Sequence, residues 1–417
     1  MTEHFDFLDS MPDADRQQQW FANLPNALQQ ATNHCPGLAK HLQGHDIKTI
    51  FSARALTTLP VLRKSAIIDA QNNKPPFGGF VNENNLAGCR VFMSPGPVWE
   101  LQANGSDPWQ AARALHAAGL RSGDRVHNTF SYHNTPGGFM LDEGARELGC
   151  TVYPAGVGNT SQQLDAIAHM NSNVFIGTPD YLQILFDKAA EEGRSISSIK
   201  TAMVSGGALF PAMRAAYLEA GVHVQQCYAT ADLGVIAYET ASGGEIHGGM
   251  LLNENLYLEI VRPGTGELVA GDEVGEMVVT RFNPEYPLVR FATGDMSAWL
   301  DEPSPCGRSQ RRIKGWMGRA DQRTKVRGMF VDPIQIQAVR RRHKAILQLR
   351  MVVGRANDRD TLQLQVYLDP AVSGKPSADE LAETVKECCG LYAEISFLDT
   401  VLPADGIVVD DTRTYNA

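Results

Sequence analysis

The sequence predicts an α/β fold. A large N-terminal domain of parallel αβα layers with a β-rich subdomain is followed by a small α+β C-terminal domain. Three observations lead to this prediction. Strand-like and helix-like segments alternate over residues 125–204, which is the rhythm of βαβ units. Short alternating strands follow over 245–280 and indicate the β-rich subdomain. About a hundred residues then remain, and their mixed helical and strand-like patterns are typical of a compact α+β module.

The expected elements can be placed in order along the chain. Amphipathic patterns predict N-terminal helices at residues 15–31 and 37–42. The βαβ region predicts strands at 125–130, 149–154, 174–177 and 201–204, with helices at 140–148, 161–170 and 179–192. The C-terminal module predicts helices at 333–342 and 379–389, with strands at 348–353, 361–368 and 393–398. In a parallel sheet, ligands bind at the carboxyl ends of the strands, so the site residues are expected in the loops that follow them.

Composition and charge argue against several classes of protein. The 417 residues suffice for one large and one small domain, and a formal net charge of -10 argues against a nucleic-acid surface. No apolar run approaches the length of a membrane span. The first ten residues, MTEHFDFLDS, are acidic and unlike a secretory signal, and the 7 Cys form no CxxC pair. We therefore expect a cytoplasmic protein that binds neither nucleic acid nor membrane.

Residues 290–295 (RFATGD) predict part of a nucleotide site. We expect a strand over 286–291 and a turn at 293–295, in which the glycine permits tight geometry and Asp295 presents a carboxylate. A carboxylate there suits the hydroxyl pair of a ribose. About two dozen residues further on, Arg319 and Lys325 lie in a polar cluster bracketed by glycines, which suits a phosphate clamp.

Five motifs in a fixed order resemble the adenylate-forming superfamily of acyl-CoA synthetases, adenylation domains and luciferases, and within it the phenylacetate-CoA ligase branch. They are LPVLRKS (59–65), PAGVGNT (154–160), GTPDYL (177–182), RFATGD (290–295) and GRADQRTKVRG (318–328). The resemblance implies a large domain over 1–319 and a mobile small domain over 320–417, which turns about a hinge near Asp321. It also implies ATP, Mg²⁺ and CoA as cofactors and a homodimer as the assembly.

The resemblance also assigns roles to residues of this chain. Asp232 is expected to bind Mg²⁺ and to act in catalysis with Arg319 and Lys325, while Asp295 holds the ribose. ATP or AMP is further expected to contact Ser94 and Gly96 in a phosphate loop, Ser205, Gly206, Gly207 and Ala208 in a loop beside the adenine, and Tyr228, Ala229 and Thr230. Tyr132, His133 and Gly207 are the candidates for the acyl pocket, although His133 could equally be satisfied by a local backbone bond.

Three departures from the family pattern stand out. The segment at the phosphate loop, 90–100, contains Pro95 and Pro97, which have no N–H to offer a phosphate, so it is either a variant phosphate loop or a rigid structural turn. Ile407 stands where the family places a catalytic lysine. Some relatives bind a structural zinc through four ligands. Of these, the chain keeps His247 and Cys306, whereas Thr240 and Ser304 stand at the other two positions, so we expect no zinc.

The resemblance implies an AMP-forming acid–thiol ligase. It would activate a small aromatic carboxylic acid with ATP as an acyl-adenylate and transfer the acyl group to CoA. Because Ile407 cannot neutralise a carboxylate or a phosphate, two alternatives stay open. One is an adenylation-impaired homologue that only transfers an activated acyl group to a thiol or forms an amide with an amine. The other is a non-catalytic protein that binds a nucleotide or an acyl-adenylate.

Overall fold

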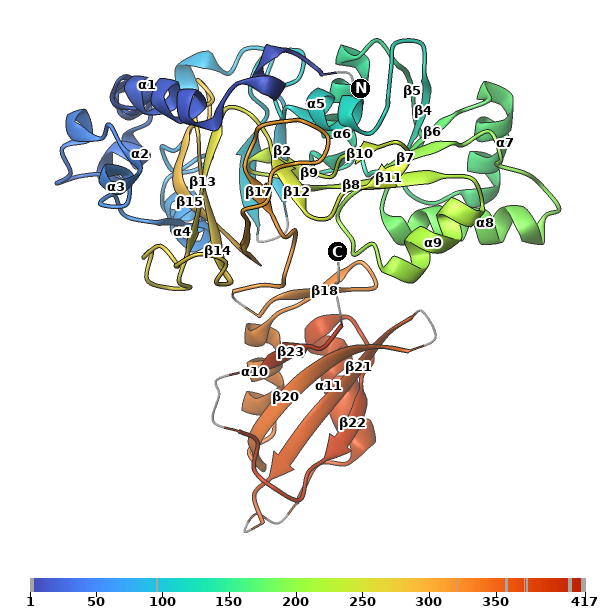
Figure 1. Ribbon diagram of the computed structural model, residues 1–417. Coiled ribbons are helices and arrows are strands. Elements are labelled where there is room, and N and C mark those ends of the chain that lie inside the picture. The colour runs from blue at the N-terminus through green and yellow to red at the C-terminus, as the bar shows by residue number, and fades with distance from the viewer. Residues whose placement is uncertain are drawn as a thin grey trace. The chain divides into compact units, whose positions relative to one another are not determined.

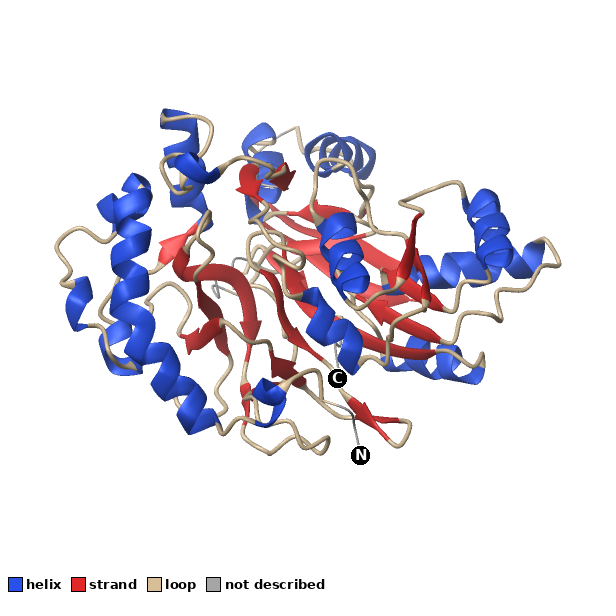
Figure 2. Ribbon diagram, turned by 90° about the horizontal axis from the view of Figure 1, so that it is seen from above, coloured by secondary structure: helices blue, strands red, loops and turns tan. Residues whose placement is uncertain are grey.

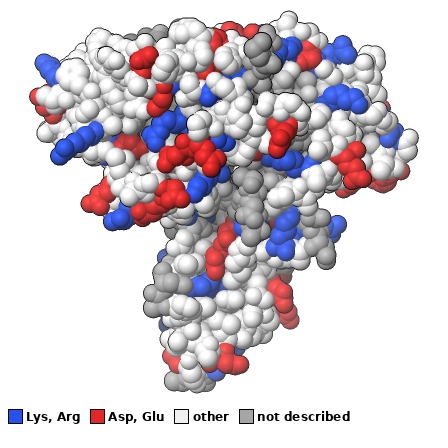
Figure 3. Space-filling view, viewed as in Figure 1, with Lys and Arg blue, Asp and Glu red and all other residues white. Residues whose placement is uncertain are grey.

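The computed structural model describes residues 4–94, 97–320, 322–356, 359–370, 372, 374–403 and 407–413. The chain forms two compact units (Figure 1). The larger comprises Met1–Thr293 and Ser297–Trp316, and the smaller comprises Gly294–Met296 and Met317–Tyr415. Among the helices of the described residues, none is both long enough and apolar enough to cross a membrane. Acidic and basic side chains are interspersed over the face shown in Figure 3.

The largest sheet lies in the larger unit, and its strands are ordered β16-β17-β12-β9-β8-β7-β6-β4-β5. In chain order the strands are β4 (Arg125–Asn128), β5 (Thr151–Pro154), β6 (Val174–Gly177), β7 (Thr201–Val204), β8 (His223–Thr230), β9 (Gly234–Tyr238), β12 (Met250–Leu252), β16 (Trp299–Leu300) and β17 (Arg312–Ile313). The segment β5-β4-β6-β7-β8 is parallel, so its carboxyl ends share one edge. The predicted parallel sheet is therefore confirmed.

Helices cover both faces of this parallel segment (Figure 2). They are α5 (Ala111–Ala117), α6 (Gly137–Glu147), α7 (Thr160–Met170), α8 (Pro179–Glu191) and α9 (Pro211–Glu219). Val174 and Ile176 of β6 pack in the same cluster as Leu115 of α5. Phe175, between them, packs with Leu182 of α8 on the other side. Successive strand residues face opposite ways, so this alternation produces the three αβα layers.

A second sheet of the larger unit has the order β1-β15-β14-β13. Its strands are β1 (Leu62–Arg63), β13 (Leu256–Val261), β14 (Gly275–Arg281) and β15 (Leu288–Ser297). The predicted turn at 293–295 is wrong, because β15 continues through it to Ser297. Gly294 has φ +75°, a left-handed conformation that a glycine adopts without strain, so the strand bends there and does not end.

One long helix and several short ones lie before β13 in the chain. They are η1 (Phe7–Ser10), α1 (Asp13–His34), α2 (Pro36–His41), η2 (Ile47–Thr49), α3 (Ala53–Leu56), α4 (Lys64–Asn73) and η3 (Glu83–Asn85). Leu24 and Leu28 of α1 share a buried cluster with Leu258 and Met277 of β13 and β14. Two small hairpins complete the unit, namely β2 (Val91–Ser94) with β3 (Val98–Leu101) and β10 (Ala241–Ser242) with β11 (Glu245–Ile246).

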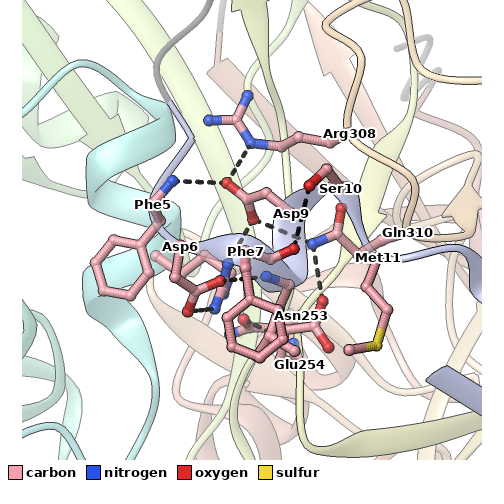
Figure 4. A network of polar contacts seen from close by, with 12 residues as sticks. Phe5, Asp6, Phe7, Asp9, Ser10, Met11, Asn253, Glu254, Arg308 and Gln310 are labelled. Carbon is pink, nitrogen blue, oxygen red and sulfur yellow. Dashed lines mark hydrogen bonds and ion pairs between the residues drawn. The ribbon is translucent and has the colours of Figure 1, made fainter.

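A buried carboxylate anchors the N-terminal segment to the larger unit (Figure 4). Asp9 is fully buried, and its side chain accepts hydrogen bonds from Arg113 Nη1 at 2.5 Å, Arg308 Nε at 3.1 Å and Gln310 Nε2 at 3.2 Å. It also accepts from the backbone N–H of Phe5 at 2.8 Å. Burial acts to raise the pKa of Asp9, but these hydrogen bonds and the two guanidinium charges outweigh it and lower that pKa.

The smaller unit is an α+β module with a sheet of order β22-β21-β20-β23. Its elements are β18 (Thr324–Val326), β19 (Met329–Val331), α10 (Pro333–Arg342), β20 (Ile346–Ala356), β21 (Arg359–Leu368), α11 (Ala378–Cys389), β22 (Glu394–Phe397) and β23 (Val409–Asp411). Capping boxes at Asp332 and Ser377 begin the two helices. Val339 and Leu381 from these helices pack on Met351 and Leu364 of the sheet. The predicted C-terminal helices are confirmed.

Candidate active site

The carboxyl edge of the parallel sheet gathers several of the predicted site residues. Tyr132 follows β4, the run 205–208 follows β7, and residues 228–230 end β8. Since these strands are parallel and belong to one sheet, their ends lie at the same edge. The loops also approach one another, because a Cβ added to Gly206 would lie 3.6 Å from the Phe130 ring. This edge is the candidate site in the larger unit.

The loop after β7 has the shape expected of a ligand-facing turn. Ser205 is buried, and its Oγ donates to the carbonyl of Cys227 at 2.8 Å, which ties the loop to β8. Gly206 has φ +68°, and Gly206 and Gly207 are exposed, whereas Ala208 is half-buried. A Cβ on Gly207 would lie 3.2 Å from Asp180 Oδ1, so a larger residue would crowd the start of α8. The loop therefore exposes the backbone of Gly206 and Gly207, and its contact with an adenine stays a prediction.

The end of β8 presents one buried ring and two small side chains. Tyr228 is buried, while Ala229 and Thr230 are half-buried. Thr230 Oγ1 accepts a hydrogen bond from the N–H of Leu233 at 3.2 Å, which shapes the turn between β8 and β9. That turn carries Asp232, whose side chain is only 4% exposed.

The two acyl-pocket candidates next to β4 differ in their surroundings. The hydroxyl of Tyr132 accepts from Asn128 Nδ2 at 2.8 Å and donates to Asp142 Oδ2 at 2.9 Å. Burial and the charge of Asp142 raise the pKa of Tyr132, so this hydroxyl stays protonated and held in place. His133 is exposed, and its backbone N–H donates to Ser131 Oγ at 3.1 Å. Their contact with an acyl group stays a prediction.

The segment at the expected phosphate loop is a β-hairpin. β2 and β3 are paired from Val91 opposite Leu101 to Ser94 opposite Val98. The Oγ of Ser94 donates to Glu100 Oε1 at 2.5 Å. Gly96 lies outside the described residues, so the choice between a phosphate loop and a structural turn stays open. What the hairpin does show is that a carboxylate, Glu100, is turned towards the site.

A lysine that the sequence reasoning passed over lies at the centre of this region. Lys64 Nζ lies 3.1 Å from Asp232 Oδ2, 3.3 Å from Ser94 Oγ and 3.4 Å from Glu100 Oε1. Burial acts to lower the pKa of Lys64, but the charges of Asp232 and Glu100 outweigh it and raise that pKa, so the ammonium is retained. Burial and the charge of Asp232 place the pKa of Glu100 well above its usual range.

Two of the five motifs position Lys64. β1, within LPVLRKS, pairs in parallel with β15, within RFATGD, so that Leu62 lies opposite Phe291. Arg290 fastens the pair: its buried guanidinium donates to both oxygens of Glu259 and to the carbonyls of Thr57, Leu59 and Gly266. These bonds use all the N–H groups of a guanidinium. α4 then begins at Lys64.

A signal for Lys64 was present in the sequence. The N-terminus of a helix carries partial positive charge, so a lysine as the first residue of α4 is locally unfavourable. Such a local conflict often marks a functional or strained position. Glu100, in the apolar run VWEL, is a second conflict of the same kind.

Asp295 and Arg319 meet in the smaller unit. Arg319 Nη1 lies 3.0 Å from Asp295 Oδ1, and the two residues also form an antiparallel bridge. Asp295 is buried, which suits a carboxylate held in one orientation. Lys325 is exposed in the middle of β18. Asp321, the expected hinge, lies outside the described residues.

Comparison with known proteins finds relatives of this chain in both sequence and fold. The sequence model of the AMP-binding enzyme family matches residues 144–283. The phenylacetate-coenzyme A ligase of Aromatoleum evansii is 28% identical over 378 residues, which are 86% of this chain and 83% of that protein. The ligase of the same name from Thermus thermophilus is 30% identical over 281 residues, which are 66% of this chain and 63% of that protein. The chain is a homologue of the phenylacetate-coenzyme A ligases. A crystal structure of 2-hydroxyisobutyryl-CoA ligase with 2-HIB-AMP and CoA shares its fold, with a TM-score of 0.79 at 23% identity over 98% of this chain and 92% of that one.

In this phenylacetate-CoA ligase homologue, the predicted magnesium ligand has another partner. The fold family implies Mg²⁺, which prefers six oxygen ligands in a regular octahedron. Asp232 and Glu100 could offer such oxygens, but the ammonium of Lys64 lies within 3.4 Å of both carboxylates. The ammonium of Lys64 therefore occupies the position next to Asp232 Oδ2 and Glu100 Oε1 at which a divalent cation would be expected.

The four positions of the zinc site of some relatives do come together in this homologue. Thr240 Oγ1 lies 3.2 Å from His247 Nδ1, and Ser304 Oγ lies 3.0 Å from Cys306 Sγ. Burial acts to raise the pKa of Cys306, but hydrogen bonds from Ser304 and Thr240, among others, outweigh it and lower that pKa. Hydrogen bonds therefore connect these side chains, and the absence of zinc stays a prediction.

Ile407 lies in the smaller unit of the homologue. Ile407 is 37% exposed, and its carbonyl accepts a hydrogen bond from Arg350 Nε at 3.3 Å. An aliphatic side chain provides no charge for a carboxylate or a phosphate. The hydrogen bond from Arg350 ties the backbone of Ile407 to β20.

Proposed function

We propose that the chain is an acid–thiol ligase that activates a small aromatic carboxylic acid with ATP and transfers the acyl group to CoA. One structural observation carries this proposal. The carboxyl edge of the parallel sheet presents an exposed glycine backbone at 206–207 beside the buried ring of Tyr228, which suits a flat purine. The homology to proteins named phenylacetate-coenzyme A ligases supports the aromatic acid and CoA as substrates.

The proposed reaction has two steps. A carboxylate oxygen of the acid attacks the α-phosphorus of ATP, and the bond to pyrophosphate breaks. The thiol of CoA then attacks the carbonyl carbon of the acyl-adenylate, loses its proton, and AMP leaves. We assign Ser205–Ala208 and Tyr228–Thr230 to the adenine, Asp295 to the ribose hydroxyls, and Arg319 and Lys325 to the phosphates. The hydroxyl of Tyr132, fixed by Asn128 and Asp142, would line the acyl pocket.

The division of labour between the domains is part of the proposal. We place the boundary after residue 319 and the hinge at Asp321, so that the small domain turns between the two steps. We also infer a cytoplasmic homodimer, as the family resemblance implies. Light scattering on the purified protein over a series of concentrations tests the assembly.

The absence of a lysine at 407 makes the first step slow in this proposal. Losing one preorganised charge at a reacting centre costs roughly a hundredfold or more in rate. Ile407 is therefore the observation that favours the second candidate, a homologue that only transfers an activated acyl group or forms an amide. The two candidates differ in whether pyrophosphate is released from ATP.

Pyrophosphate release, measured with ATP and a panel of aromatic acids with and without CoA, tests the proposal. The ligase predicts acid-dependent pyrophosphate and CoA-dependent AMP in equal amounts. Asp295→Asn should lower kcat/KM for ATP by about tenfold or more, because a charged hydrogen-bond acceptor is lost. Asp301→Asn removes a carboxylate from an exposed position and should change nothing. Thioester formation from a supplied acyl-adenylate without any pyrophosphate release would establish the second candidate instead.

A further inference from the structure

The ammonium of Lys64 fills a position built from oxygen atoms of separate chain segments. Its neighbours are Asp232 Oδ2 at 3.1 Å, Ser94 Oγ at 3.3 Å and Glu100 Oε1 at 3.4 Å. An ammonium has three N–H donors, and three acceptors satisfy it completely. The turn after β8, the end of β2 and the middle of β3 thus converge on a single cation supplied by the start of α4.

Burial favours a cation at this position. The side chains of Asp232 and Glu100 are 4% and 2% exposed, whereas that of Lys64 is 31% exposed. An ionised carboxylate so deeply buried is stable only when it is paired. Lys64 therefore reaches in from the surface to supply the charge that Asp232 needs.

The backbone that carries Lys64 is firmly held. β1 is paired with β15, and Arg290 donates to the carbonyls of Thr57 and Leu59 just before it. The helix that begins at Lys64 repels the ammonium through its dipole, so the carboxylates and not the helix account for its position. A divalent cation at Asp232 would have to displace this ammonium or be repelled by it.

We infer that Lys64 is the resident cation of the nucleotide site, and that this chain binds ATP phosphates at Asp232 without a divalent cation held by the protein. The inference deepens the proposed function and rests on it for the role in ATP binding. The occupancy of the cation position by Lys64 does not depend on it. Two measurements test the occupancy of the cation position and the binding of ATP separately.

The first measurement is a titration with Mn²⁺, followed by the paramagnetic resonance of the free ion. Wild type and Asp232→Asn should bind Mn²⁺ equally weakly. Lys64→Met leaves two buried carboxylates without a cation, and it should gain one Mn²⁺ site with an affinity at least about tenfold higher. Adding Asp232→Asn to Lys64→Met should abolish that site. Lys74→Met, at the other end of α4 and exposed, is the matched control and should behave as wild type.

Either of two results would overturn the inference: a wild-type Mn²⁺ site that Asp232→Asn removes, or a folded Lys64→Met protein that gains none. If Lys64→Met does not fold, Lys64→Gln keeps hydrogen-bonding capacity without the charge and carries the same expectation. Circular dichroism establishes folding in each case.

The second measurement compares the Kd for ATP with excess Mg²⁺ and with a chelator, by calorimetry. Wild type should change by less than about threefold, and Lys64→Met by about tenfold or more. A wild-type affinity that falls with the chelator as strongly as that of the variant contradicts the inference. If wild type binds no ATP in either condition, the proposed function fails, while the Mn²⁺ titration still decides whether Lys64 is the resident cation.

Discussion

Replacing Asp9 with asparagine should destabilise the larger unit strongly, because its carboxylate ties the N-terminal segment to that unit. The carboxylate is fully buried and pairs with Arg113 and Arg308, whose side chains are 7% and 3% exposed. Asparagine keeps the volume but removes the charge and turns an NH₂ group towards donors. Removing one partner of a buried ion pair costs about 3–5 kcal/mol. Arg113 keeps Asp6 at 2.5 Å, so the lower end, about 3 kcal/mol, is expected.

Urea unfolding followed by tryptophan fluorescence measures this change in the stability of the larger unit. The 5 Trp residues all belong to the larger unit, so the signal reports on its unfolding. Asp301→Asn, at an exposed position, should change the free energy of unfolding by less than about 0.5 kcal/mol. A loss below about 1 kcal/mol for Asp9→Asn would refute the reasoning, because the carboxylate would then have no need of its partners.

The pH dependence gives a second check on Asp9. Its pKa is lowered in the folded protein, so the unfolded chain takes up a proton first as pH falls. The stabilisation is therefore fully present above the ordinary carboxyl range and is lost as pH falls through the lowered pKa. The difference between wild type and Asp9→Asn should shrink in acid. A difference that stays constant down to the lowest pH at which the protein folds would contradict the assignment.

Three other predictions follow from the same structure. Arg290→Lys, which cannot replace the five N–H donors, should cost roughly 3 kcal/mol or more in urea unfolding, whereas Arg262→Lys at the exposed pair with Glu267 should cost little. Ile407→Lys should raise acid-dependent pyrophosphate release by about a hundredfold, with Val401→Lys, another exposed apolar position, as the inactive control. Because the pKa of Glu100 is raised, folding stability should fall by up to about 1.4 kcal/mol per pH unit as pH rises above the usual carboxyl range, and Glu100→Gln should remove this slope.

The parts of the fold that follow from local patterns could be predicted from the sequence. The parallel sheet follows from alternating apolar strands and helices, and the start of α10 follows from Asp332 and Pro333, a cap and a first helical residue. The turn expected at 293–295 was wrong because Gly294 bends a strand that tertiary pairing continues. A glycine in such a run marks a special conformation but does not say which one.

Contacts between distant segments could not be predicted. Asp9 pairs with Arg308, and Lys64 with Asp232, across separations of 299 and 168 positions. A single sequence carries no pattern that joins such positions. Such a contact shows in the sequence only as a residue that is locally unfavourable, such as a lysine at a helix N-terminus, which a distant partner must stabilise. The charges of the site were therefore sought in Asp232, Asp295, Arg319 and Lys325, and Lys64 was passed over.

The most direct test of the proposed ligase uses an aromatic acid labelled with oxygen-18 in its carboxylate. If that carboxylate attacks the α-phosphorus of ATP, one labelled oxygen remains on the phosphate when CoA displaces AMP. Mass spectrometry of the released nucleotide should then find AMP carrying a single oxygen-18. Thioester formed without labelled AMP, or no nucleotide product with any acid of the panel, would contradict the account.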